Sequence, residues 1–287
     1  MDGLLIIDKP AGITSHDVVA RVRRALHTKR VGHTGTLDPF ATGVMVILVG
    51  KATRLAQFLD KDEKEYEAVI RFGFETDTGD NTGTPKSEAD GPRTIAADQV
   101  ESVLARFRGT IMQTPPMYSA KKVEGQKLYE LARRGVVVDR KPVEVSISKL
   151  EILSSADTSA RIRVGCSAGT YIRTLAEDIG REIGIGAHLT ELRRTRAGRF
   201  TIDEAVKLDD VGQTDLRPVE LAVEHLPAFS LREDRVAKTL NGMSTRDLSG
   251  TFADGELVRM TVPSGELVAI GFFDDAEKVV QPKVVLG

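Results

Sequence analysis

The segment VGHTGTLDPFATG at residues 31–43 places one carboxylate, that of Asp38, among three glycines and directly before a proline. A residue that precedes proline is biased toward extended backbone, and glycines permit tight turns and the close approach of another molecule. A carboxylate with an unperturbed pKa of about 3.9 is ionised at neutral pH, so it can act as a nucleophile without a helper base. An Asx-type turn without any chemical role is the alternative interpretation of this segment.

Two more side chains with chemical potential lie in periodic segments. Apolar and charged residues alternate over 65–72, which predicts a strand with Tyr66 at the start of its apolar face. Apolar residues at helical spacing over 172–183 predict a helix that ends at Gly184, with Arg173 in its first turn. From the patterns alone, Tyr66 is a core tyrosine and Arg173 an exposed surface arginine. Arginine nevertheless holds a carboxylate through two N–H groups, a geometry that lysine does not reproduce.

The elements that must position these residues follow from the same patterns. Apolar runs and alternation predict strands near residues 4–8, 44–50, 143–147 and 161–166. Helical spacing predicts a helix after Ser15, which we expect to be its N-cap, and a helix over 98–107. Asp98 and Glu101 resemble a capping box at the start of that second helix. Residues 203–224 are acidic and are expected to form a peripheral helix and a linker.

Composition along the chain indicates two domains and an RNA partner. Residues 1–199 hold 31 Lys and Arg against 26 Asp and Glu, whereas residues 200–287 hold 9 against 16. The proline-rich, basic segment after residue 112 is typical of an exposed excursion that closes on RNA and becomes ordered there. We therefore expect a catalytic domain at 1–229 with an RNA-clamping insertion at about 112–142, and a small β-barrel domain at 230–287. Three basic clusters fit a structured RNA: Arg21, Arg23, Arg24, Lys29 and Arg30; Arg133, Arg134, Arg140 and Lys141; and Arg193, Arg194, Arg196 and Arg199.

Several classes of protein are disfavoured. The only cysteine, Cys166, excludes an intrachain disulfide, and its place in an alternating strand favours a buried structural thiol. No apolar run reaches the length of a membrane helix and no signal peptide is recognisable, so we expect a cytoplasmic protein without membrane contact. His16 and His33 each lie near a single acid, which is poor evidence for a metal site, and we expect none.

Five segments together resemble the TruB family of tRNA pseudouridine synthases. The segment at 31–43 is similar to the family's HxGTLDPxAxG motif, and DKPAGITS at 8–15 is similar to its opening box. KEY at 64–66 and GTYIRTL at 169–175 resemble its tyrosine and arginine motifs, and AHLTELRRT at 187–195 follows its pattern as well. Met45 and Val46 stand where family members often have leucine and proline, an apolar exchange that concerns packing and not the chemistry.

The resemblance implies a fold and an activity. The fold is α+β (mixed α/β), a pseudouridine synthase fold with a central, largely antiparallel sheet flanked by helices, followed by a PUA-like β-barrel. The activity is isomerisation of the T-loop uridine (uridine-55) of tRNA to pseudouridine after base flipping. Because the reaction involves no redox change and no external group, no cofactor is expected, and no obligatory protein partner is implied. A guide-RNA-dependent enzyme of the dyskerin type and a tRNA-folding chaperone are the alternatives.

The resemblance also assigns roles to individual residues. Asp38 is the expected nucleophile, Arg173 pairs with it, and Tyr66 stacks on the uracil and assists with the C5 proton. His33 is placed to occupy the space that the flipped uridine leaves. The remaining candidates for contact with the substrate, or for a structural role beside it, are Lys9, Gly35, Thr36, Asp80, Tyr171 and Leu192.

Overall fold

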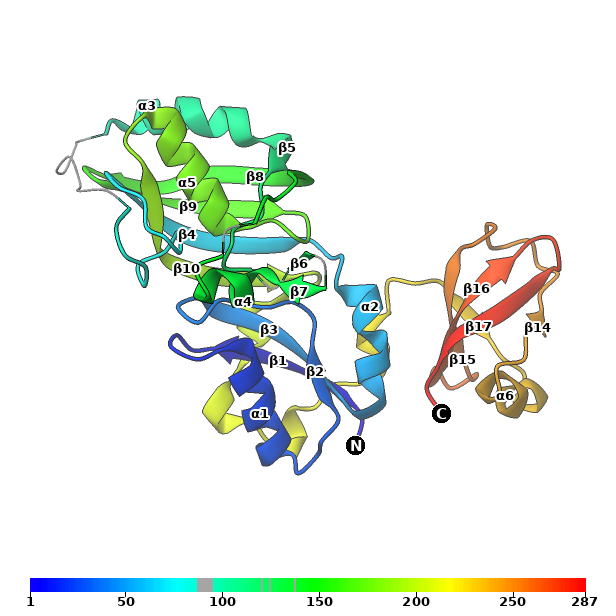
Figure 1. Cartoon of the computed structure of the whole chain (residues 1–287). Helices are drawn as coiled ribbons and strands as arrows, with labels where there is room; N and C mark the ends of the chain where they lie inside the picture. Colours follow the sequence, from blue (N-terminus) through cyan, green and yellow to red (C-terminus); the bar gives the residue numbers. More distant parts are fainter. Residues whose placement is uncertain (87–94, 120, 124, 137) are drawn as a thin grey trace.

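The computed structural model describes residues 1–86, 95–119, 121–123, 125–136 and 138–287. A large unit built on one sheet and a smaller unit at the C-terminal end of the chain are joined by a narrow connection (Figure 1). The helices are α1 (Ser15–Ala25), α2 (Ala56–Leu59), α3 (Ala97–Leu104), α4 (Leu128–Arg133), α5 (Ile172–Ile183) and α6 (Glu233–Leu240). No helix in these described ranges is long and apolar enough to cross a membrane.

The large sheet runs in the order β12-β1-β3-β10-β4-β9-β8-β5, with β2 beside β3 and β11 beside β10. Only the β1–β12 and β3–β10 pairs are parallel among its described strands, so the expectation of a largely antiparallel sheet is confirmed. Its strands are β1 (Gly3–Lys9), β2 (Val31–His33), β3 (Thr42–Val49), β4 (Lys64–Phe72), β5 (Gly109–Gln113), β8 (Val143–Ala156), β9 (Ser159–Cys166), β10 (Ala187–Ala197), β11 (Phe200–Thr201) and β12 (Val206–Lys207).

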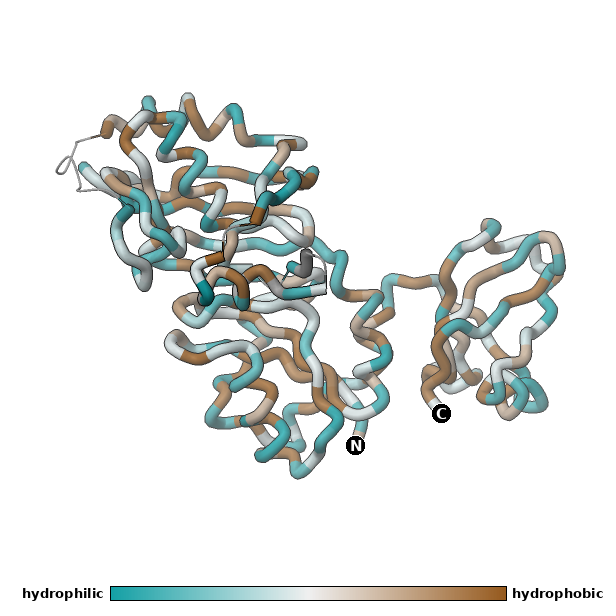
Figure 2. The backbone as a smooth tube through the Cα atoms, viewed as in Figure 1, coloured by the Kyte–Doolittle hydropathy of each residue, from teal (hydrophilic) through white to brown (hydrophobic). Residues whose placement is uncertain are grey.

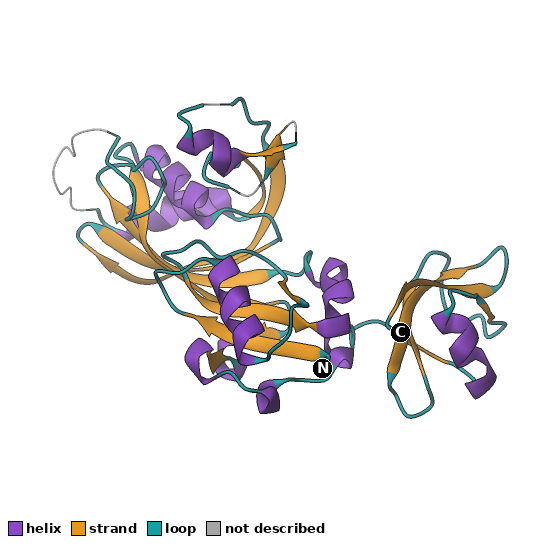
Figure 3. Cartoon of the chain, turned by 60° about the horizontal axis from the view of Figure 1, so that its bottom comes forward, coloured by secondary structure: helices purple, strands orange, loops and turns teal. Residues whose placement is uncertain are grey.

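The two faces of this sheet bury different neighbours, because side chains along a strand alternate between faces. On one face, Leu5 and Ile7 of β1 pack with apolar residues of α1, α3 and α5 in the main core. On the other face, Leu4 and Ile6 pack against the 3₁₀ helix Gly50–Leu55, helix α2 and the smaller unit. Figure 2 shows brown, hydrophobic stretches along β1 and β3, and Figure 3 shows α1 lying across the strands near the N-terminus.

The smaller unit is a curled five-stranded sheet with its own core. Its strand order is β13-β15-β16-β17-β14, and Val258, Met260 and Phe273 are fully buried between the strands and α6. This confirms the expected small barrel-like unit, while its relation to PUA domains and the boundary at 229/230 stay predictions. The strands are β13 (Ala228–Ser230), β14 (Thr245–Arg246), β15 (Leu257–Thr261), β16 (Leu267–Asp274) and β17 (Val279–Val285).

Three local predictions were wrong. Thr14, not Ser15, caps α1, in a capping box with Asp17, because Ser15 is buried and bonds elsewhere. Helix α3 has Ala96 at its N-cap with no side-chain hydrogen bond, so Asp98 and Glu101 form no capping box. Residues 203–224 contain short 3₁₀ turns and strand β12 where a helix was predicted. The segment predicted to clamp RNA holds β6 (Lys122–Val123), β7 (Gln126–Lys127) and α4.

A buried arginine–aspartate pair as the candidate active site

The loop that carries Asp38 joins β2 to β3 and is held by the N-terminal segment. Ser15 clamps Leu37 from both sides: its Oγ accepts from the Leu37 amide at 2.9 Å and donates to the Leu37 carbonyl at 3.0 Å. The Gly12 amide donates to the Pro39 carbonyl at 2.8 Å. Both backbone neighbours of Asp38 are therefore fixed, which restricts where the carboxylate can point.

Lys9, at the end of β1, is fully buried beneath this loop. Its Nζ donates to the carbonyls of Ala41 at 2.6 Å, Pro10 at 3.0 Å and Pro39 at 3.2 Å. Burial lowers the pKa of Lys9 to about 8, while the nearby Asp38 carboxylate raises it in part. With three carbonyls around its ammonium group, Lys9 stabilises the loop from inside, and the structure gives it no exposed surface for contact with RNA.

Arg194 of β10 is a second buried cation beside the loop, and the sequence analysis assigned it wrongly to an RNA-facing cluster. Its side chain is 2% exposed, and its Nε donates to the Val44 carbonyl at 2.7 Å. Its terminal nitrogens reach the carbonyls of Gly35 at 3.2 Å and Thr36 at 3.5 Å. The backbones of these two predicted substrate contacts are thus turned inward onto Arg194.

The rest of that basic cluster is also engaged by protein groups. Arg193 makes two hydrogen bonds to the Asp8 carboxylate, at 2.8 and 3.1 Å. Arg196 donates to a backbone carbonyl at 3.0 Å, and Arg199 pairs with Glu224. All four arginines of this cluster therefore contact protein groups in and around β10. Arg194 is two residues after Leu192, on the buried face of the same strand, and this alternation is the sequence signal that could have predicted its burial.

The catalytic candidates Asp38 and Arg173 meet as the sequence analysis expected. Arg173 Nε lies 2.8 Å from Asp38 Oδ2, and Arg173 Nη2 donates to Asp38 Oδ1 at 3.1 Å. The arginine side chain is 5% exposed, whereas that of Asp38 is 32% exposed, so the carboxylate remains open on one side. Two further hydrogen bonds orient the guanidinium, to the carbonyls of Thr78 at 2.7 Å and Tyr118 at 2.8 Å.

Asp80 forms the back of this site. Its Oδ2 lies 3.9 Å from Arg173 Nη1, and its Oδ1 accepts hydrogen bonds from Thr78 Oγ1 and from the amide and hydroxyl of Thr82. With its side chain only 6% exposed, Asp80 acts on Arg173 from inside the protein. The structure therefore places this predicted substrate contact in a carboxylate–guanidinium–carboxylate row.

The surroundings change the acidity of the two reactive candidates. Burial raises the pKa of the Asp38 carboxyl, an effect that the charge of Arg173 opposes and that of Asp80 reinforces. Burial also raises the pKa of Tyr66, so this residue of β4 keeps its phenolic proton at physiological pH. Tyr66 pairs in register with Arg194 across the sheet and is 8% exposed.

The other predicted substrate contacts, His33, Leu192 and Tyr171, differ in burial and in their hydrogen-bond partners. His33 ends β2 with its ring 6.0 Å from that of His16, and its buried Nδ1 has no partner among the described groups. Burial, together with the charges of His16 and Arg194, lowers the pKa of His33, which favours a neutral ring. Leu192 is buried in the main core, 7% exposed. Tyr171 is half-buried at the N-cap of α5, two residues before Arg173.

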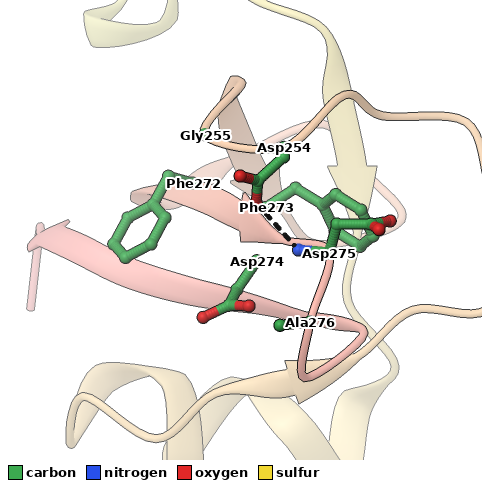
Figure 4. Close-up of a pocket in the computed structure, with 7 residues that line it drawn as sticks. All are labelled: Asp254, Gly255, Phe272, Phe273, Asp274, Asp275 and Ala276. Carbon is green, nitrogen blue, oxygen red and sulfur yellow. Dashed lines mark hydrogen bonds between the residues drawn. The ribbon is translucent and has the colours of Figure 1, made fainter.

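The smaller unit offers a different surface. Figure 4 shows a depression that is lined by Asp254, Gly255, Phe272, Phe273, Asp274, Asp275 and Ala276. Its three carboxylates repel phosphate groups, so we do not expect RNA to bind there.

Across the described residues, no group of three or more His, Cys, Asp and Glu side chains is arranged to hold a metal ion. The expected absence of metal and cofactor stays a prediction.

Comparison with solved structures defines the class of fold. A chain of a crystal structure of a Cbf5–Nop10–Gar1 complex superimposes with a TM-score of 0.76 and 29% identity, over 99% of this chain and 85% of that chain. A structure of an H/ACA RNP bound to a substrate RNA containing 2′-deoxyuridine gives a TM-score of 0.74 and 28% identity, over 99% of this chain and 85% of that chain. The crystal structure of the archaeal box H/ACA sRNP Nop10–Cbf5 complex gives the same TM-score and identity, over 99% and 86%. The protein therefore has the pseudouridine synthase fold.

Comparison of sequences then gives the family. Residues 23–172 match the family model described as TruB family pseudouridylate synthase, N-terminal domain, and residues 173–224 match the tRNA pseudouridylate synthase B C-terminal domain. The tRNA pseudouridine synthase B of Bacillus pumilus is 41% identical, over 94% of this chain and 92% of the relative. That of Solibacter usitatus is 44% identical, over 94% and 95%. The chain belongs to the TruB family of pseudouridylate synthases.

Proposed function

We propose that this protein is a tRNA pseudouridine synthase that isomerises the T-loop uridine, uridine-55, with Asp38 as the nucleophile. The observation that carries the proposal is the two-pronged contact of Arg173 with Asp38, in a loop that hydrogen bonds to Ser15 and Gly12 hold in place. Relatives that are 41% and 44% identical over nearly their whole length are named tRNA pseudouridine synthase B. Their names support tRNA as the substrate.

The reaction is an isomerisation whose atoms balance within one nucleotide. The N1–C1′ bond of uridine breaks, the released uracil turns, and its C5 forms a bond to C1′. The proton at C5 leaves and N1 gains one, so no oxidant or transferred group is required. The enzyme must therefore supply an ionised nucleophile, hold the detached base and move one proton.

The described side chains divide these tasks. Asp38 attacks either the base or C1′, and the charge and hydrogen bond of Arg173 favour its ionised form against burial, which raises the pKa of the carboxyl. Tyr66, protonated and buried beside the site, packs on the uracil and assists removal of the C5 proton. His33 fills the stack that the extruded uridine leaves. Leu192 and Tyr171 line the space for the base, while Lys9, Arg194 and Asp80 hold the loops around it.

The two alternatives are a guide-RNA-dependent enzyme of the dyskerin type and a tRNA-folding chaperone. The Cbf5 structures are complexes with other proteins, and one contains a substrate RNA, but they are only 28–29% identical to this chain. The curated relatives are closer in sequence, and their names contain no protein partner. Activity without a guide RNA or a protein partner is therefore part of the proposal. Cytoplasmic location and the role of residues 112–142 as an RNA clamp stay predictions.

The test uses purified protein and a transcript of the T stem-loop alone. The wild-type protein should form pseudouridine at the T-loop uridine, and Asp38→Asn should bind the transcript with unchanged affinity but form none, because an amide is no nucleophile. Asp209→Asn is the matched control, since Asp209 is an exposed partner of Arg21 at the surface. Binding without product by the wild type would indicate a chaperone, and activity only with added guide RNA would indicate the dyskerin type. Substantial product from Asp38→Asn would refute the assignment of the nucleophile.

A further inference from the structure

Gln113 is a buried polar residue that the proposed chemistry does not use. It is the last residue of the edge strand β5, pairs with Val143 of β8, and has a fully buried side chain. Its side-chain amide makes two hydrogen bonds to one residue 58 positions away, Tyr171. Oε1 accepts from the Tyr171 amide at 2.8 Å, and Nε2 donates to the Tyr171 carbonyl at 3.1 Å. The side chain thus pairs with the Tyr171 backbone as a neighbouring strand would.

This clamp lies at the start of the helix that carries Arg173. Tyr171 is the N-cap of α5, and its own side chain makes no capping hydrogen bond. The Tyr171 carbonyl also accepts the first helical hydrogen bond, from the Leu175 amide at 3.1 Å. Gln113 therefore supplies through a tertiary contact the restraint that a capping side chain ordinarily supplies. Arg173, two residues further on, starts from a backbone that Gln113 fixes.

A second contact links the same segment to Arg173. Five residues after Gln113, the Tyr118 carbonyl accepts a hydrogen bond from Arg173 Nη2 at 2.8 Å. The same Nη2 donates to Asp38. The segment that begins at Gln113 thus restrains Arg173 both at its backbone and at its guanidinium.

We propose that Gln113 is a positioning residue for the isomerisation: it orients Arg173, and through it the Asp38 carboxylate, by clamping the backbone of Tyr171. The inference rests on the proposed roles of Asp38 and Arg173. Because the Gln113 side chain has no exposed surface, it makes no contact with RNA in this arrangement. Its loss should therefore change the rate of the chemical step and leave RNA affinity unchanged.

The experiment is a double-mutant cycle in the full-length protein. Gln113→Met keeps nearly the same shape but removes both hydrogen bonds, and Gln113→Glu keeps the acceptor for the Tyr171 amide. Single-turnover rates are measured with excess enzyme on a whole-tRNA transcript labelled with tritium at C5 of its uridines. The temperature is kept well below the melting transition of every variant. Gln57→Met is the matched control, because the Gln57 amide donates to a backbone carbonyl at the exposed surface.

The expected result is a fall of tenfold or more in the rate of Gln113→Met, since small errors in catalytic geometry cost up to about a hundredfold. Gln113→Glu should lie between Gln113→Met and the wild type. Dissociation constants for the tRNA should agree within twofold. In an Arg173→Lys background, where Arg173 no longer needs orienting, Gln113→Met should add less than a twofold loss.

Three outcomes would overturn the inference. These are a wild-type rate for Gln113→Met, an equal loss in both backgrounds, and a loss that resides in tRNA affinity. A purely structural role for Gln113 predicts equal losses in both backgrounds, so the cycle separates the two. If Gln113→Met does not fold, the same cycle with Gln113→Glu decides. A wild-type enzyme that releases no tritium would refute the proposed function instead.

Discussion

Replacement of Arg173 by lysine tests the electrostatic core of the site. The guanidinium makes hydrogen bonds of 2.7–3.1 Å to the Asp38 carboxylate and to the Thr78 and Tyr118 carbonyls. A lysine keeps the charge but has a single nitrogen, so it cannot contact both oxygens of Asp38 and both carbonyls. At least one charged hydrogen bond to Asp38 is lost, which costs about 1.5–3 kcal/mol. At 1.36 kcal/mol per factor of ten, that cost predicts a rate about ten to 150 times lower.

The assay is single-turnover tritium release from saturating tRNA, with affinity measured in parallel by filter binding. Because the Arg173 side chain is 5% exposed, we expect the dissociation constant to change little. Arg181→Lys is the matched control: Arg181 lies on the same helix and pairs with Glu75, but it is 51% exposed. A rate within twofold of the wild type for Arg173→Lys would refute the argument that the two-pronged contact orients Asp38.

Three further predictions concern stability and RNA affinity. Gly43→Ala should lower the free energy of unfolding in urea by about 2 kcal/mol or more, because its φ is +103° and a Cβ would lie 2.2 Å from a backbone oxygen; Gly12→Ala, with φ +85° and open space around it, should lose less. Burial raises the pKa of the Cys166 thiol from 9.0 to about 11, so the folded protein keeps a proton that the unfolded chain releases. Relative to Cys166→Ala, the wild type should therefore lose about 2 kcal/mol of stability as the pH rises from 9 to 11, and equal pH profiles in chemical denaturation would contradict this. Replacing the exposed Arg134 and Lys141 by glutamine should flatten the slope of log affinity against log salt by about 0.7 for each phosphate contact with single-stranded RNA, and an unchanged slope would show that neither side chain contacts phosphate.

Periodicity predicted the main elements because each buries one apolar face. The alternation from Tyr66 to Phe72 matches a strand whose alternate residues are buried, and the apolar stripe of α5 ends at Gly184, where φ is +90°. The prediction of the residue that caps α1 failed because two candidates are adjacent. Thr14 and Ser15 both have hydroxyl groups, but the partner of Ser15 lies 22 residues away at Leu37. No local pattern contains that information.

Charge led the sequence analysis to the wrong location for Arg194, whereas the resemblance had already implied a structural role for Lys9 beside the active site. Cations are expected at the surface because burying an unpaired charge is costly, and clusters of arginine are therefore attributed to RNA binding. Both side chains are nevertheless buried, since carbonyls of the catalytic loop satisfy their N–H groups. Three carbonyls around Lys9 and three around Arg194 take the place of water as hydrogen-bond acceptors. The loop therefore allows the two cations to be buried, and the two cations in turn hold the conformation of the loop.

The resemblance predicted the pair of Asp38 and Arg173, but not the groups that orient Arg173. Each lies in a recognisable motif, yet they are 135 residues apart in sequence, and the fold brings them together by pairing β3, which follows the Asp38 loop, with β10, which follows α5. The groups that orient Arg173 are backbone carbonyls, which every residue possesses and no motif reveals. Side chains that act by binding backbone, as Gln113 does, are therefore the part of a catalytic site that only a structure identifies.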